Sequence, residues 1–358
     1  RRPRLIGAGF FLEVAYVKER RRSGGRVWLR VLAAVVLLLA AAAAVVLGIG
    51  IYILRGIDRV PINEENLYIN EKLSGGGTAG TESDASGGGA VAGTPAQEQA
   101  ARRAVVNIAV FGVDTRDVQS FSGGADTVMI ASIDREAGRV CLTSILRDSW
   151  IDVAGYGSMK LTDVYRRYGP EIMIQTLNRK FQMNIADYVS VNMYHLADAV
   201  DLIGGIELEI TQAEMEQINR YSGSQELLTA AGDVRLNGAQ AAMYARIRQI
   251  DSDQERVRRQ RNVLVGIYSR VRELPAVRYP SILRTLLEMT ETSMTYSEIV
   301  SYLPLLSRDL RLDSLTIPGA VENAYGGQNY PGLEGKWVWV YDYDTAAQNL
   351  YRFIYEDA

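Results

Sequence analysis

The run VVNIAVFGV, residues Val105–Val113, predicts the centre of the fold. An almost unbroken apolar run of this length is typical of a strand that is buried on both faces of a sheet. Two more strand patterns follow at Thr127–Asp134 and Arg139–Leu146. Because only the short turn Arg135–Gly138 joins them, we expect these two strands to be antiparallel.

Helical and strand patterns alternate over the rest of the chain. The expected helices are Leu161–Tyr168, Glu171–Phe181, Leu196–Ile203, Ala239–Arg248, Asp253–Arg272, Ser297–Leu306 and Thr345–Tyr355, and the expected strands are Tyr188–Asn192, Ile206–Ile210, Ser314–Ile317 and Trp337–Tyr341. Strands interleaved with helices predict an α/β fold: a layered sandwich with a mixed central β-sheet flanked by helices.

The stretch Val31–Leu54 carries no charge and consists mostly of Ala, Val and Leu. At about 1.5 Å per residue, a helix of this length spans about 36 Å, which exceeds a bilayer core of about 30 Å. We therefore predict one N-terminal transmembrane helix. A cleaved signal peptide is the alternative, but its apolar region is usually about 7–15 residues long.

Charge predicts the orientation and the compartment of each part. Residues 1–30 are rich in Lys and Arg, which favours a cytoplasmic tail and an exported chain after Leu54. We expect a single-pass protein of the cell membrane with four parts: the cytoplasmic basic tail 1–30, the transmembrane helix 31–54, a juxtamembrane segment with a flexible Gly/Ser/Ala linker 55–104, and an extracellular domain 105–358. Residues 1–56 hold 10 Lys or Arg and 2 Asp or Glu, so within a chain of net charge −3 the remainder carries −11. This charge disfavours nucleic acid as a partner.

Several kinds of catalytic site are excluded by composition. The chain has one histidine, His195, and one cysteine, Cys141. From this we exclude Ser-His-Asp and Cys-His catalytic sites, multi-His metal sites and an intrachain disulfide. We expect His195 to be structural, and Cys141 to be a small buried apolar residue. No phosphate-binding P-loop pattern is present. Catalysis would therefore depend on carboxylates, arginines and a hard metal ion.

Carboxylates and arginines follow the predicted strands. The first strand runs into Asp114 and Arg116, and Asp126 stands at the entry to the next strand. A loop that turns back between these strands would bring Asp114 and Asp126 together, and two close carboxylates favour a shared cation such as Mg²⁺ or Mn²⁺. The alternative is that each Asp caps a turn. Arg147 follows the third strand and could point into a cleft or pair with Asp148.

Six arginines fall within 16 residues near the end of the predicted Ala239–Arg248 helix and the start of the next: Arg246, Arg248, Arg256, Arg258, Arg259 and Arg261. Arg256 and Gln260 are four residues apart and share a helix face. Arginine suits bidentate recognition of phosphate oxygens, so the cluster fits a diphosphate. The alternative is a solvated helix face paired with Asp251, Asp253 and Glu255. That alternative explains Arg258 and Arg261 better than it explains the others.

Five spaced motifs together resemble one known family. They are G-x-D-x-R at residues 112–116, D-T at 126–127, S-I-x-R-D-S at 144–149, Y-A-R-x-R at 244–248 and S-D-x-x-R-x-x-R-Q at 252–260. In these motifs the chain resembles the LytR–CpsA–Psr family of cell-wall glycopolymer phosphotransferases, over about Val105–Val271. It departs from the family at Leu146, where a proline often precedes the Arg, and at Gly124, where some members carry another arginine.

The resemblance implies an activity and a set of partners. It implies a membrane-anchored phosphotransferase of a Gram-positive bacterium that moves a glycopolymer, of teichoic acid or capsule type, from a polyprenyl diphosphate carrier to peptidoglycan with the help of Mg²⁺. The lipid tail would occupy an apolar tunnel between sheet and helices. A non-catalytic polyprenyl-diphosphate binding or regulatory protein, or a polyprenyl-diphosphate pyrophosphatase, remains as an alternative.

The resemblance also implies roles for particular residues. Asp114 and Asp126 would hold the metal, and Asp253 would position arginines or act near the acceptor. The diphosphate would be bound by Arg116, Arg147, Arg246, Arg248, Arg256 and Gln260. The catalytic set would be Asp114, Asp126, Arg147, Arg246 and Asp253, and the role of Lys160 is left open.

Overall fold

The structure is a computed structural model, and it describes residues 58–63, 65, 67–69, 105–115, 117 and 120–356. The predicted basic tail, the transmembrane stretch Val31–Leu54 and most of the predicted linker lie outside these residues. Within the described part, no helix is both long enough and apolar enough to cross a membrane.

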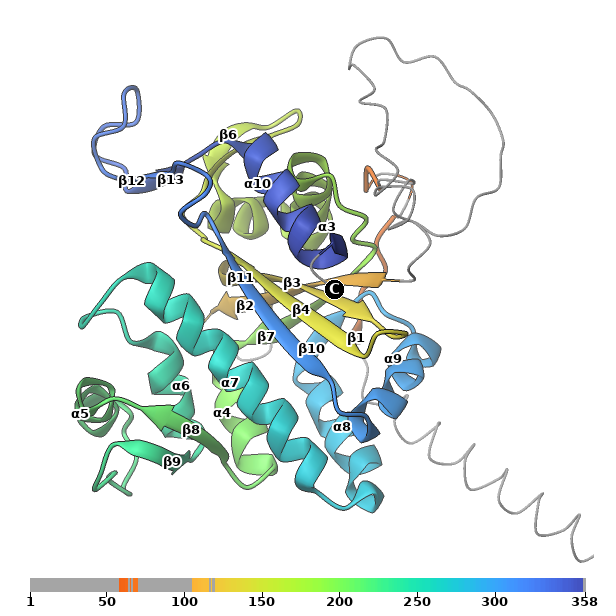
Figure 1. Cartoon of the computed structure of the whole chain (residues 1–358), viewed down its shortest axis with the longest axis vertical. Helices are drawn as coiled ribbons and strands as arrows, with labels where there is room; N and C mark the ends of the chain where they lie inside the picture. The colour runs from red at the N-terminus through yellow and green to blue at the C-terminus, as the bar shows by residue number, and fades with distance from the viewer. Residues whose placement is uncertain are drawn as a thin grey trace, which may run out of the picture. The chain divides into compact units, whose positions relative to one another are not determined.

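A seven-stranded mixed sheet forms the middle of the domain, in the order β1–β10–β7–β2–β3–β4–β11 (Figure 1). Its strands are β1 (Asp58–Arg59), β2 (Val105–Asp114), β3 (Gly124–Asp134), β4 (Arg139–Ile145), β7 (Asp187–Asn192), β10 (Thr290–Thr292) and β11 (Arg311–Ile317). The pairs β2–β3, β3–β4 and β10–β7 are antiparallel, and the pairs β2–β7, β4–β11 and β1–β10 are parallel. The predicted mixed sheet and the antiparallel pairing of its second and third strands are confirmed.

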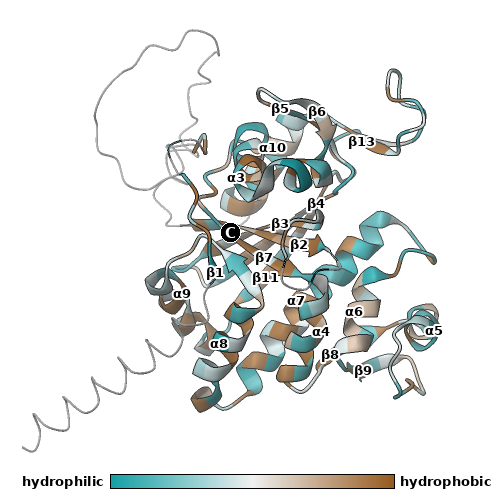
Figure 2. Ribbon diagram, turned by 180° about the vertical axis from the view of Figure 1, so that it is seen from behind, coloured by the Kyte–Doolittle hydropathy of each residue, from teal (hydrophilic) through white to brown (hydrophobic). Residues whose placement is uncertain are grey.

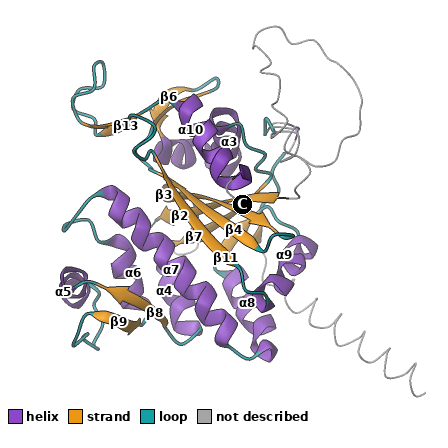
Figure 3. Ribbon diagram, in the orientation of Figure 1, coloured by secondary structure: helices purple, strands orange, loops and turns teal. Residues whose placement is uncertain are grey.

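Helices cover both faces of this sheet, as predicted (Figures 1 and 3). One face carries α3 (Leu161–Phe181) and α10 (Tyr343–Tyr351), which continues into a π-helical turn at Arg352–Glu356. The other face carries α4 (Met193–Leu202), α6 (Gly238–Arg246), α7 (Asp253–Glu273) and α8 (Tyr279–Glu288). The remaining helical segments are α5 (Gln212–Tyr221), α9 (Tyr296–Tyr302) and the short 3₁₀ turns Ala276–Arg278 and Leu303–Ser307.

Among the described residues, three two-stranded sheets lie outside the central one. They pair β5 (Trp150–Val153) with β6 (Gly157–Lys160), β8 (Ile206–Ile210) with β9 (Gly232–Leu236), and β12 (Tyr325–Gly327) with β13 (Val338–Val340). Two strands predicted from the sequence, at Ile206–Ile210 and Trp337–Tyr341, therefore belong to these small sheets. Local alternation of apolar residues identifies a strand but not its partner.

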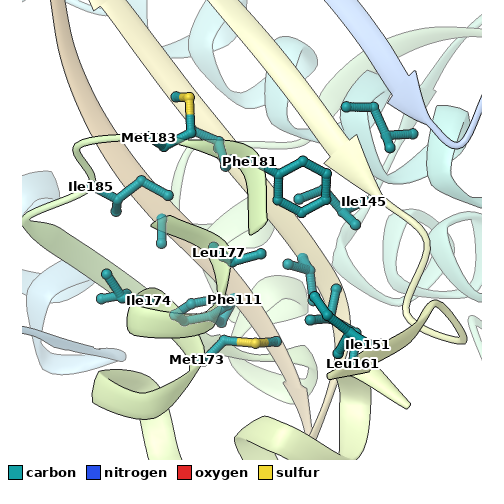
Figure 4. Close-up of a cluster of buried hydrophobic side chains, with 14 of the residues drawn as sticks. Phe111, Ile145, Ile151, Leu161, Met173, Ile174, Leu177, Phe181, Met183 and Ile185 are labelled. Atoms are coloured by element: carbon teal, nitrogen blue, oxygen red, sulfur yellow. The ribbon is translucent and has the colours of Figure 1, made fainter. Parts of the chain in front are cut away.

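Two hydrophobic cores hold the layers together. The first packs α3 and α10 on the sheet and includes Phe111, Leu177 and Phe181 (Figure 4). Cys141 is buried in it, as expected. The second joins α4, α6 and α7 through residues such as Val200 and Val263. Hydrophobic residues accordingly recur along the central strands and along α4 (Figure 2).

Local signals in the sequence set the ends of the helices near the sheet ends. Asn192 caps α4, accepting a hydrogen bond from the backbone N–H of Tyr194 at 3.0 Å, and Asn237 caps α6. Helix α6 ends at Arg246, two residues earlier than predicted, so Arg248 lies in the loop before α7. Ser252 caps α7, but Glu255 does not close a capping box there because its carboxylate pairs with Arg258 at 2.6 Å.

Candidate active site

A β-bulge places Asp126. Gly112 is paired with Thr127 and Val113 with Ala125, so Asp126 is the extra residue of β3 at this point. A bulge of this kind bends the strand and redirects a side chain. The sequence had placed Asp126 at the entry to the strand. The structure places it inside β3, where the irregular pairing frees its side chain from the alternation of the two faces.

A polar pocket of about 250 Å³, which we call the arginine pocket, lies where β2 ends and β3 begins. It is lined by Asp114, Asp126, Ala245, Arg246, Arg248, Arg256 and Gln260. Asp114 is the last residue of β2 and is exposed. Six side chains singled out from the sequence thus meet in one pocket, although they come from β2, β3, the end of α6, the following loop and α7.

Asp126 links two arginines from different elements. Its carboxylate accepts hydrogen bonds from Arg147, just beyond β4, and from Nη2 of Arg248 at 3.1 Å. Arg147 Nε also lies 3.4 Å from Asp148, and Lys160 donates to Asp148 at 2.7 Å. Arg147 therefore pairs with Asp148, one of the two alternatives considered for it, and it contacts Asp126 without being one of the residues that line the arginine pocket. Burial alone would lower the pKa of Arg147, but its attraction to Asp126 and Asp148 outweighs this effect and raises it.

Arg256 is a buried cation with unused hydrogen-bonding capacity. Its side chain is 1% exposed, and Nη2 lies 2.6 Å from the carboxylate of Asp253. Within the described structure, none of its three side-chain nitrogens makes a hydrogen bond, and neither does Oε1 of the nearby Gln260. Burial lowers the pKa of Arg256 to about 10, with Asp253 opposing the shift, so the group stays charged at neutral pH. Buried polar groups without partners are costly, and an anionic ligand would satisfy these.

Arg246 faces the same pocket from the end of α6. Its guanidinium carbon lies 5.1 Å from the centre of the Tyr194 ring, a cation–π contact that leaves its N–H donors available. No ion pair to Arg246 is present among the described residues. Asp253 is the first residue of α7 and forms an ion pair with Arg256, and its predicted role in positioning an arginine for catalysis stays a prediction. Arg116 lies outside the described residues.

The structural role of Arg259 was not predicted from the sequence. Its side chain is fully buried and forms hydrogen bonds of 2.6 and 2.7 Å to both oxygens of Asp251, one of 2.9 Å to the carbonyl of Ile247 and one of 3.2 Å to Glu214. These bonds fasten the loop that carries Arg248 onto α7. The motif S-D-x-x-R-x-x-R-Q contains Arg259, but the spacing does not show that this Arg faces the protein interior.

Arg261 was assigned to a solvated helix face, and this assignment is wrong. It donates hydrogen bonds to the hydroxyls of Ser144 and Thr316, at 3.2 and 2.5 Å, and so ties α7 to β4 and β11. The reason is that this side of α7 packs against the sheet. Arg258, by contrast, pairs with Glu255 on an exposed face, as expected.

An apolar cavity of about 200 Å³ lies between the sheet and the helices α4, α6, α7 and α8. It is lined by Val110, Phe111, Gly112, Thr127, Met129, Val191, His195, Leu196, Ala199, Ala245, Gln260, Val263, Leu264, Ile267, Leu286, Met289 and Thr290. Ala245 and Gln260 line both this cavity and the arginine pocket, so the two adjoin. His195 contacts the carbonyl oxygen of Met289 through Nδ1 at 3.1 Å, a contact that suits a structural role.

The sequence model described as the LytR_cpsA_psr family matches residues 77–352. This chain belongs to the LytR–CpsA–Psr family.

Relatives within the family have names that state an activity. The polyisoprenyl-teichoic acid–peptidoglycan teichoic acid transferase TagU of Enterococcus faecalis is 30% identical over 199 residues, which cover 54% of this chain and 63% of that protein. TagU of Bacillus subtilis is 27% identical over 197 residues, covering 54% of this chain and 61% of that protein. The matched segments thus span less than two thirds of either relative.

Solved structures of the LytR–CpsA–Psr family share the fold. A structure of TagT bound to LI-WTA aligns with a TM-score of 0.58 at 18% identity, covering 70% of this chain and 90% of that chain. TagT with bound octaprenyl pyrophosphate lipid aligns with a TM-score of 0.54 at 16% identity, again over 70% and 90%. At these identities the likeness establishes the fold.

The donor set of the arginine pocket is compatible with the magnesium ion that the LytR–CpsA–Psr resemblance implies. Asp114 and Asp126 both line the pocket. In the part of the chain that the structure describes, no group of three or more His, Cys, Asp or Glu side chains could hold a metal. Mg²⁺ is usually bound through one or two carboxylates, with waters and substrate phosphates as its other ligands. Two carboxylates beside a set of arginines fit that pattern.

Proposed function

We propose that this chain is a membrane-anchored phosphotransferase that transfers a glycopolymer of teichoic acid or capsule type from a polyprenyl diphosphate carrier to peptidoglycan. The observation that carries the proposal is the junction of the two pockets at Ala245 and Gln260. An apolar cavity that adjoins a cluster of arginines fits a molecule with a hydrocarbon chain at one end and a diphosphate at the other. The names of the relatives and of the lipid-bound structures agree with this donor.

The arginines supply binding and charge neutralisation. Arg246 and Arg256 have donors free for phosphate oxygens, whereas Arg248 and, outside the pocket lining, Arg147 are held by Asp126. Phosphoryl transfer depends mostly on positioning and on stabilising the charge of the transferred group. Preformed guanidinium groups in a partly buried pocket perform both tasks without a nucleophilic side chain. Gln260, at the junction, would orient the diphosphate through its amide.

Asp114 and Asp126 would hold Mg²⁺ beside the diphosphate. When bound, the ion would neutralise phosphate charge and favour departure of the lipid phosphate. Asp253 would keep Arg256 in place from the start of α7. The predicted span Val31–Leu54 would anchor the domain on the extracellular side of the cell membrane, where a polyprenyl-linked donor would also be located.

The test is an assay of transfer with the purified full chain, a polyprenyl-diphosphate-linked glycan, Mg²⁺ and peptidoglycan. We expect Arg246→Ala and Asp114→Ala to abolish transfer while circular dichroism shows an intact fold. Arg258→Ala, in an exposed ion pair, is the matched control and should keep normal transfer. Normal transfer by folded Arg246→Ala and Asp114→Ala would refute the assignment. Phosphate release without an acceptor would instead indicate a pyrophosphatase, and lipid binding without turnover a binding protein.

A further inference from the structure

A second polar pocket, of about 470 Å³, lies beside α3. It is lined by Asp58, Ser120, Phe121, Ser122, Tyr165, Arg166, Gly169, Pro170 and Glu291, and it shares none of these residues with the arginine pocket or the apolar cavity. We propose that this pocket, the α3 pocket, binds the glycan strand of peptidoglycan that accepts the polymer. The inference rests on the proposed function.

The α3 pocket is built into the fold. Helix α3 is interrupted at Gly169, where φ is 78° and ψ is −173°, and Pro170 follows. A side chain at Gly169 would meet no atom within 4 Å, so the interruption opens space beside the helix. Tyr188 donates a hydrogen bond to Glu291 at 2.9 Å, which fixes the wall at β10. The hydroxyls of Tyr165, on α3, and Ser190, on β7, lie 2.8 Å apart and hold α3 to the sheet.

The α3 pocket is a neighbour of the arginine pocket across the ends of β2 and β3. Nη2 of Arg166 lies 2.5 Å from the point where a Cβ on Gly124 would stand. Gly124 is paired with Asp114, which lines the arginine pocket. An acceptor hydroxyl must approach the phosphorus atom from a place that the lipid does not occupy. A pocket on the α3 side of these strand ends provides such a place, because the apolar cavity lies on the α7 side.

The lining suits an uncharged sugar chain better than the transferred polymer. Asp58 and Glu291 can accept hydrogen bonds from sugar hydroxyls, Ser122 can donate or accept, and Phe121 offers an aromatic face. The one cation, Arg166, is already paired with Asp163 at 3.0 Å. A polymer rich in phosphate would meet two carboxylates here without a free cation and would be repelled. The glycan strand of peptidoglycan carries no phosphate, and its lactyl carboxyls are uncharged where they are amide-linked to the stem peptides.

The experiment measures initial rates of transfer in the full chain against the concentration of a soluble peptidoglycan glycan fragment, at fixed donor. Ser122→Trp fills the pocket from an exposed loop position, and Glu291→Gln removes an acceptor charge while it can keep the bond to Tyr188. We expect either change to raise the KM for the glycan fragment by about tenfold, the loss expected for one or two hydrogen bonds. The kcat and the affinity for octaprenyl diphosphate should stay within about twofold. Ser158→Trp and Glu207→Gln, exposed and outside all three pockets, are the matched controls.

Three outcomes would overturn the inference. In the first, the KM for the glycan fragment is unchanged in both variants. In the second, the variants lose affinity for octaprenyl diphosphate as well as for the glycan fragment. In the third, only the KM for the polymer-bearing donor rises. The third result would assign the α3 pocket to the donor glycan. If the wild-type chain binds octaprenyl diphosphate but transfers nothing, the proposed function fails. Calorimetric binding of the glycan fragment to wild type but not to Ser122→Trp would still support an α3 glycan pocket.

Discussion

Asp126 and Arg248 are 122 positions apart in the sequence, yet their side chains are joined by a hydrogen bond of 3.1 Å. The bond connects the bulge in β3 to the loop between α6 and α7. The same carboxylate also holds Arg147. Asp126 is therefore the residue through which three separate segments determine the shape of the arginine pocket.

Replacing Asp126 by Asn should disable the site without unfolding the protein. The substitution removes the charge that holds Arg147 and Arg248, and with it one of the two carboxylates available for Mg²⁺. We expect transfer to fall by about 100-fold or more, the usual scale for one preorganised electrostatic group. Asp313→Asn is the control, because Asp313 also pairs with two arginines, Arg139 and Arg311, outside the three pockets. Equal rates for Asp126→Asn and wild type would contradict this role.

Removing the buried cation Arg259 should destabilise the domain. Arg259→Met leaves Asp251 and Glu214 without their buried partner, and breaking a buried ion pair from one side costs about 3–5 kcal/mol. Arg258→Met, one residue earlier, breaks the surface pair with Glu255 and a longer 3.8 Å contact with Glu214, which Arg259 still neutralises, so it should cost only about 0–1 kcal/mol. Urea denaturation followed by circular dichroism gives both free energies of unfolding. Similar values for the two variants would show that the Arg259 network does not hold the loop.

Narrowing the apolar cavity should change the length of lipid that the protein accepts. Ile267 lies two helical turns beyond Gln260 on α7, about 10 Å further along the cavity wall. With Ile267→Trp, we expect the KM for long polyprenyl donors to rise by about tenfold, because their distal methylenes lose burial. Donors with two or three isoprene units should be unaffected. Val277→Trp, at a position 86% exposed, is the control, and an equal effect on short and long donors would argue against a tail-binding cavity.

Substitution by alanine should affect transfer differently at the two glycines before Ala125, Gly123 and Gly124. A Cβ on Gly123 would overlap the backbone carbonyl of Asp114, which cannot move without shifting β2. A Cβ on Gly124 would instead meet two side chains, the guanidinium of Arg166, which is half exposed and can rotate away, and Oγ1 of the buried Thr162 at 2.9 Å, which must shift slightly. We expect Gly123→Ala to reduce transfer by at least about tenfold and Gly124→Ala to reduce it much less. A larger loss in Gly124→Ala would show that the position of Arg166 matters more than that of Asp114.

Glu291 should make stability depend on pH. Burial raises the pKa of its carboxyl in the folded protein above the ordinary 4.5. The folded state therefore holds this proton to higher pH than the unfolded chain does. The stabilisation that comes from this bound proton is complete below about pH 4.5, the pKa in the unfolded chain, and it declines as the pH rises through the pKa of the folded protein. The glutamine in Glu291→Gln cannot titrate. Between the unfolded and the folded pKa of Glu291, the slope of the free energy of unfolding against pH should therefore be less negative in this variant than in wild type. An unchanged slope would show that the pKa of Glu291 is not raised by folding.

Most elements near the site could be predicted because their signals are local. The apolar run Val105–Val113 identified the central strand, and the helices predicted at Leu161–Tyr168 and Glu171–Phe181 correspond to the two parts of α3 on either side of the break at Gly169. Helix α8 and strand β10, which contribute to the apolar cavity, were not predicted, and neither were α5 and β9. Strand β10 has only three residues, too few for a periodic pattern, whereas α5 has a local signal, the capping box at Thr211 and Glu214, that was overlooked. The residues of the arginine pocket were selected by their chemical type and by a family resemblance, and their roles in catalysis remain predictions.

The sequence by itself determined the order of the strands and helices, the family and the set of carboxylates and arginines available for phosphate chemistry. The tertiary structure decided that Asp126 is a bulge residue, that Arg259 and Arg261 serve the fold, and that an apolar cavity adjoins the arginines at Gln260. The physical reason is that strand and helix patterns depend on neighbouring residues. Burial, ion pairing and the space between elements depend on partners far away in the chain, which no local pattern specifies.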